Sequence, residues 1–95
     1  MIKPSIGRVV LFWPGPPVHS EVQPMPALVA FVHSDRLINV GGFDMNGNPI
    51  KATSVTLLQD DDVPPSVGPY AEWMPYQKGQ AAKTEALEAS IGRVG

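Results

Sequence analysis

Proline divides this chain into short segments. The 95 residues include 11 prolines, and five of these lie within residues 14–26. Because proline lacks a backbone N–H and has a fixed φ, it interrupts both helices and strand ladders. The apolar residues between the prolines form short runs rich in β-branched and aromatic side chains, a pattern typical of strands. The sequence therefore predicts one small, mainly β domain, with room for a helix only after residue 77.

Five segments are predicted as strands, each bounded by residues that favour turns. They are residues 8–13, 27–33, 36–40, 53–58 and 70–74. The first run is apolar at successive positions near its end, which predicts burial on both faces there. Polar and apolar residues alternate from Ser54 to Leu57 in the fourth run, so Val55 and Leu57 are expected inside.

The connections between these strands follow from turn chemistry. Residues 14–26 are expected to form a long, stiff surface loop, because their prolines favour extended conformations. The Ser34-Asp35 pair predicts a tight hairpin. Gly41-Gly42 suggests a bulge or a sharp bend. Asn46-Gly47 predicts a turn with positive φ values, and residues 60–65 form a further loop.

This order of strands and loops resembles the SH3-like small barrel, over about residues 5–75. The resemblance implies an all-β, five-stranded barrel for residues 1–76. An open sheet completed by a neighbouring chain is the alternative. Residues 77–95 contain good helix formers and mostly alanine on their apolar positions. They are expected to form either a docking helix or a flexible tail.

Composition excludes several classes of function. The net charge is −2 and the seven basic residues are scattered, which disfavours nucleic-acid binding. There is no cysteine and no apolar stretch long enough to predict a membrane-spanning helix. His19 and His33 are far apart in sequence and lack partners at metal-ligand spacing. No metal, cofactor or membrane contact is expected.

No catalytic motif is present. The serines lack a nucleophile elbow, and no glycine-rich phosphate loop or paired carboxylates suggest acid–base chemistry. The spacing of Asp44, Asn46 and Asn48 matches the first ligands of a calcium-binding loop. The glycine, however, is at the fourth position of the loop instead of the sixth, and Val55 stands where the final glutamate ligand is required, which favours a plain turn. Residues 60–62 are read as a solvated acidic loop. We therefore expect a protein that is not an enzyme.

The large side chains near the end of the barrel are the candidate binding residues. Their composition is typical of interface anchors, although a core or subunit-interface role is favoured over a groove for proline-rich peptides. The predicted partner-binding residues are Trp13, Tyr70, Trp73, Met74, Tyr76 and Leu87.

Two stretches of the chain resemble small proteins of tailed bacteriophages and prophages. They are residues 70–81, and residues 30–40 followed by Phe43-Asp44 and Asn46-Gly47. The resemblance implies a virion accessory protein, such as a capsid decoration or a head–tail component. Such a protein would contact a phage structural protein and itself, and it would reside in the virion and in the host cytoplasm during assembly. A phage-encoded module that modulates a host protein or defence system, engaged through the acidic residues 60–62, is the alternative.

Overall fold

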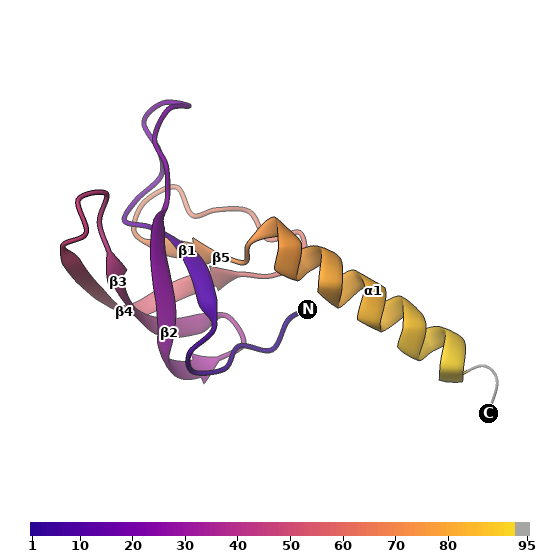
Figure 1. Ribbon diagram of the computed structural model, residues 1–95. Helices are drawn as coiled ribbons and strands as arrows, with labels where there is room; N and C mark the ends of the chain where they lie inside the picture. The colour runs from indigo at the N-terminus through magenta and orange to yellow at the C-terminus, as the bar shows by residue number, and fades with distance from the viewer. Residues whose placement is uncertain (93–95) are drawn as a thin grey trace.

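The fold is a five-stranded barrel followed by one helix (Figure 1). The computed structural model describes the backbone of residues 1–92 and the side chains of residues 1–84 and 87. The elements are β1 (Val9–Trp13), β2 (Met25–Ser34), β3 (Leu37–Phe43), β4 (Pro49–Leu58), β5 (Tyr70–Glu72) and α1 (Pro75–Gly92). The expected mainly β class with a small barrel is confirmed, and of the two alternatives left for the C-terminal segment the structure has the helix.

The strands follow one another around the barrel in sequence order. Neighbouring strands pair antiparallel from β1 through β4, and β1 also pairs antiparallel with β5. The barrel is closed by a parallel pairing between β4 and β5. The open-sheet alternative is therefore wrong for this chain, because β5 supplies the missing neighbour from within it.

Alternating side chains of all five strands fill the barrel. Val55 and Leu57 are fully buried, as their alternation predicts. Removing such aliphatic side chains from water contributes roughly 1.5–3 kcal/mol each. The buried apolar cluster consists of Val10, Phe12, Ala27, Val29, Ile38, Val40, Val55, Leu57, Ala71 and Trp73.

The sheet bends around Asn39. One residue of β3, Asn39, lies opposite two residues of β4, Thr53 and Ser54, and Ser54 has a φ of 53°. The Asn39 side chain compensates for the disrupted ladder, because its Oδ1 accepts a hydrogen bond from the Ser54 N–H at 2.8 Å. The β2–β3 ladder shifts register on either side of the same residue, between Val29 and Phe31 and again after Val32. Bulges of this kind increase strand bending and help a short sheet to close.

The glycine pair of β3 does not form the predicted bulge. The β3–β4 register runs unbroken through Gly41 and Gly42. Gly42 is needed for a different reason: a Cβ at this position would overlap the Pro26 carbonyl oxygen and lie 2.7 Å from the Ala27 Cα. The backbones of β2 and β3 thus approach too closely for any side chain at Gly42.

The turn at residues 44–48 is confirmed, with a different conformation from the expected one. Gly47 has a φ of 81°, whereas Asn46 does not adopt a positive φ. The Asp44 carboxylate instead accepts hydrogen bonds from the backbone N–H groups of Asn46 and Asn48, both at 2.9 Å. These bonds favour the ionised acid and lower the pKa of Asp44.

We predict that Gly42→Ala lowers the free energy of unfolding by about 1–3 kcal/mol, because the added methyl group forces two strands apart. Gly41→Ala is the matched control, since the nearest heavy atom to its new Cβ is the Ile50 carbonyl oxygen at 3.9 Å. It should change stability by less than about 0.5 kcal/mol. Urea denaturation of the two variants measures the difference, and equal effects would contradict the close-approach explanation.

Candidate functional site

The helix begins at a well-defined junction with the barrel. Met74 precedes the first helical residue, and Pro75 occupies the first position, where its missing N–H costs nothing. The Gln77 side chain accepts a hydrogen bond from the Met74 N–H at 2.8 Å and donates one to the Val9 carbonyl oxygen at 3.0 Å. The first contact is half of a capping box. The second ties the same turn of the helix to β1.

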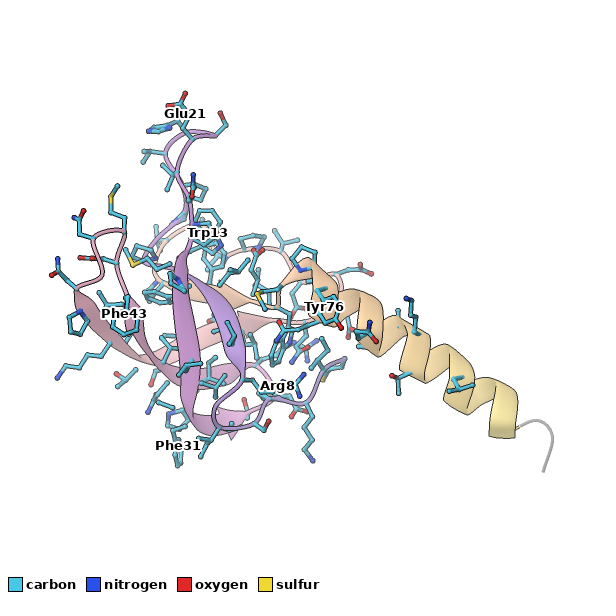
Figure 2. The ribbon with its side chains drawn as sticks, viewed as in Figure 1. Arg8, Trp13, Glu21, Phe31, Phe43 and Tyr76 are labelled. Carbon is cyan, nitrogen blue, oxygen red and sulfur yellow. The ribbon has the colours of Figure 1, made fainter. Side chains whose placement is uncertain are left out.

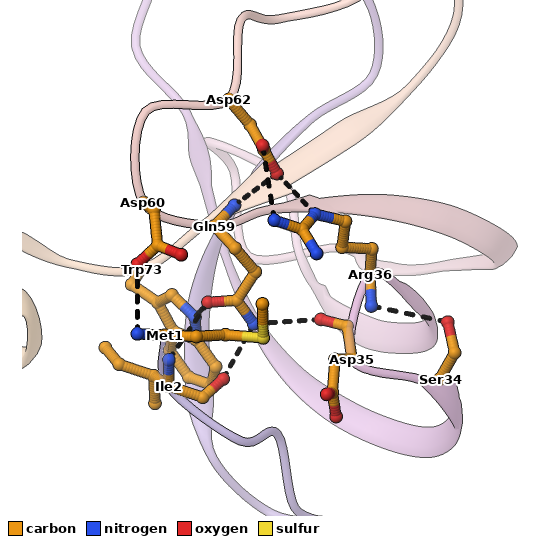
Figure 3. Close-up of polar contacts among 9 residues, drawn as sticks. All are labelled: Met1, Ile2, Ser34, Asp35, Arg36, Gln59, Asp60, Asp62 and Trp73. Atoms are coloured by element: carbon orange, nitrogen blue, oxygen red, sulfur yellow. Dashed lines mark hydrogen bonds and ion pairs between the residues drawn. The ribbon is translucent and has the colours of Figure 1, made fainter.

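A buried amide lies beside this junction (Figure 3). Gln59 is the buried polar side chain among the described residues, with 2% of its surface exposed. Its Oε1 accepts hydrogen bonds from the Ile2 N–H at 3.1 Å and from the Trp73 indole N–H at 3.2 Å. Its Nε2 donates to the carbonyl oxygens of Ile2 at 2.7 Å and Asp35 at 2.8 Å. Every hydrogen-bonding position of the amide is therefore used.

The acidic loop is tied to the rest of the protein. Asp62 accepts hydrogen bonds from the Arg36 guanidinium, at 2.8 Å from Nε, and from the Gln59 N–H at 2.8 Å. The Arg36 bond is the larger cause of the lowered pKa of Asp62, and it also raises the pKa of Arg36. Asp60 pairs with the Met1 ammonium at 2.9 Å (Figure 3). Two of the three adjacent acids thus have partners within the chain.

The predicted binding residues divide into two groups. Tyr70 and Trp73 are buried, with 3% and 1% of their surfaces exposed, so neither ring is presented to a partner. Trp13 is half-buried and stacks on Tyr70, with ring centroids 6.0 Å apart. Its indole N–H is buried without a hydrogen-bond partner. Tyr70 and Trp73 belong to the interior of the barrel, and Trp13 stacks on Tyr70. The three rings therefore do not form an open aromatic groove.

The remaining predicted residues lie at the helix. Met74 is half-buried at the junction, whereas Tyr76 and Leu87 are exposed on α1, at 73% and 61% (Figure 2). The helix runs away from the barrel and touches it only near its beginning (Figure 1). Of residues 77–95, which were expected to form a docking helix or a flexible tail, positions 93–95 lie outside the described residues.

Two hollows of about 300 and 430 Å³ lie where Met1 and Ile2 approach the helix, and both are open to solvent. Lys78 and Asp61 border the first, and Arg8 borders the second. No cluster of three or more potential metal ligands occurs within the part of the chain that the structure describes. No helix in residues 1–92 is long and apolar enough to cross a membrane.

A second apolar surface was missed in the sequence. The outward-facing side chains of β1, β2 and β3 include Val9, Leu28 and Phe43, which are 37%, 50% and 54% exposed. The first strand was expected to be buried on both faces near its end, where Phe12 is buried and Leu11 and Trp13 are half-buried, whereas Val9 at its start is exposed. The continuous apolar runs were the available signal, since a strand with one wet face normally alternates. We call Val9, Leu11, Pro26, Leu28 and Phe43 the outer apolar face.

Comparison with known proteins gives no relative. No family model, curated protein or solved structure matches the chain.

We predict that Gln59→Leu lowers the free energy of unfolding by roughly 2–4 kcal/mol, because it leaves the Trp73 indole N–H and the Ile2 N–H without an acceptor. The exposed Gln23→Leu is the matched control and should have little effect. Urea denaturation, with fluorescence of the tryptophans as the signal, measures both. A Gln59 variant as stable as the control would show that the amide network is dispensable.

We also predict that the Arg36–Asp62 pair contributes to acid sensitivity. The folded protein lowers the pKa of Asp62, so the stabilisation is complete above the unfolded pKa of about 3.9 and is lost as the pH falls through the folded value. Asp62→Asn should therefore be less stable than the parent near neutral pH and lose less stability on acidification. In an Arg36→Gln background the same substitution should have a smaller effect. Equal pH profiles in the two backgrounds would contradict this role for the pair.

Proposed function

We propose that this protein is an accessory component of a tailed-bacteriophage particle, a capsid decoration or head–tail component that acts by protein–protein contact and performs no chemistry. The observation that carries the proposal is the projecting helix α1, which extends from a compact barrel without packing along it (Figure 1). The particle would then be its place of action, and the host cytoplasm its location during assembly.

A projecting helix of this composition needs an external partner. Most of the stability of a helix in a protein comes from tertiary packing, and this helix of 18 residues has little of it beyond its beginning. The apolar residues of α1 do not gather into one stripe, so the helix offers small alanine surfaces with Tyr76 and Leu87 as larger contacts. Partner contacts along its length would supply the stabilisation that tertiary packing gives to an ordinary surface helix.

The barrel can act as a rigid base that holds the helix in a fixed direction. Gln77 fixes the first turn of the helix to the Val9 carbonyl oxygen, and Met74 connects that turn directly to the buried Trp73. The direction in which the helix leaves the barrel is therefore held by hydrogen bonds at its first turn. A fixed direction lowers the entropy cost of docking compared with a flexible tail.

The phage assignment is supported by the resemblance of residues 70–81 and 30–40 to small phage proteins. The structure favours this role over a host-directed module that acts through residues 60–62. Asp60 and Asp62 already pair with the Met1 ammonium and Arg36, so the acidic loop offers less free charge to a basic surface than its sequence suggests.

Mass spectrometry of particles purified from cells that produce both the phage and the tagged protein tests the proposal. We expect the protein in the particles, and we expect Leu87→Ser and Tyr76→Ser each to reduce its copy number several-fold. Val18→Ser is the matched control, because Val18 is more exposed than either helix residue but lies on the loop after β1. Absence from particles, while the protein is abundant in the same cells, would overturn the proposal.

A further inference from the structure

We propose that Asn46 is a site of spontaneous deamidation and that Asp44 restrains the reaction. Asn46 lies in the turn between β3 and β4, which projects from the barrel (Figure 1). The residue is exposed, and within the part of the chain that the structure describes no group hydrogen-bonds its carboxamide. Gly47 follows it, and a glycine has no side chain to shield its backbone nitrogen from the neighbouring carboxamide.

The reaction needs only the chain itself and water. The Gly47 backbone nitrogen loses its proton and attacks the Cγ of Asn46. The new C–N bond closes a succinimide ring, and the side-chain nitrogen leaves as ammonia. Water then opens the ring at one of its two carbonyl carbons, which gives either aspartate or isoaspartate without any oxidation or reduction. This chemistry is one reason why asparagine is a thermolabile residue.

The other two asparagines of the chain are unsuited to the same reaction. The residue after Asn48 is a proline, whose backbone nitrogen carries no proton to lose. The residue after Asn39 is a valine, whose β-branched side chain crowds the nitrogen. The Asn39 carboxamide is also engaged, since its Oδ1 accepts the Ser54 N–H at 2.8 Å and lies 2.9 Å from the His33 Nε2. We therefore expect the reaction at Asn46 alone.

Asp44 holds the turn in a conformation that slows the attack. Its backbone carbonyl oxygen accepts a hydrogen bond from the Gly47 N–H at 3.0 Å, so the attacking nitrogen has to leave this bond first. Its carboxylate accepts the N–H groups of Asn46 and Asn48, both at 2.9 Å, and so holds the residues on either side of Gly47. The negative charge of the carboxylate also disfavours removal of a proton from the Gly47 nitrogen.

Deamidation changes the tip of the hairpin. Each reacted copy gains one negative charge, on a chain whose net charge is −2. In the isoaspartate product the backbone runs through the former side chain, which adds one atom to the loop that the Asp44 N–H closes on the Asn48 carbonyl oxygen at 2.9 Å. The turn should loosen while the barrel core, formed by other residues, stays folded. This inference concerns a different surface from the proposed helix contact and does not rest on it.

Incubation of the full chain at mildly alkaline pH and physiological temperature, followed over time by peptide mass spectrometry, tests the site. Tryptic cleavage after Arg36 and Lys51 releases residues 37–51, which contain all three asparagines. We expect the mass gain of an amide converted to an acid at Asn46, in aspartate and isoaspartate forms, at least tenfold faster than at Asn39 or Asn48. Reaction at Asn46 that is no faster than at Asn39 would overturn the assignment of the site.

A variant of Asp44 tests the restraint. Asp44→Ala should raise the rate at Asn46 roughly 2–10-fold, the range that corresponds to the net free energy of one hydrogen bond. Asp61→Ala is the matched control, because it removes an exposed acid of the loop between β4 and β5, and it should leave the rate unchanged. The rate at Asn39 in the same samples reports unfolding of the variant. An unchanged rate at Asn46 in Asp44→Ala, or equal acceleration at Asn39, would overturn the role of Asp44.

Discussion

The buried amide of Gln59 connects segments that are far apart in the sequence. It lies directly after β4 and hydrogen-bonds the N-terminal segment at Ile2, the β2–β3 turn at Asp35 and the indole of Trp73. A buried amide is stabilising only when its donors and acceptors are all paired, because each unpaired group costs the free energy of its lost hydration. The four groups that bond to the amide, on three residues, therefore have to be in place together, and the packing of this end of the barrel depends on all of them.

The position of the helix follows from this cluster. Trp73 is held in the core by apolar packing and by its bond to Gln59, while the Arg8 guanidinium lies 5.4 Å from the ring centroid. One residue later Met74 directly precedes α1, and Gln77 fixes the first turn of the helix to β1. The core and the projecting helix are thus coupled through four residues of chain, with no independent hinge between them.

The strands could be predicted from local patterns, whereas the closure of the barrel was implied only by a resemblance and its outer surface could not be predicted. Alternation placed Val55 and Leu57 inside, and the apolar runs located every strand. The helix starts two residues earlier than predicted, because Pro75 is favourable at a first helical position. Tyr70 and Trp73 read equally well as anchors or as core, since composition does not specify which face of a short strand is covered. The outer apolar face was missed for a related reason. The apolar run in β1 indicates burial on both faces of the strand, but the sequence does not say whether residues of the same chain cover the outer face.

The three-residue strand β5 is the element through which a pull on the helix would reach the barrel. It lies between β1 and β4, and α1 begins three residues after it. A pull on the helix is transmitted along the axis of β5, at right angles to the hydrogen bonds that it makes with β1. Those bonds are then loaded in shear and share the tension, instead of opening one at a time. The shortest strand of the barrel is in this way suited to carry load between the helix and the core.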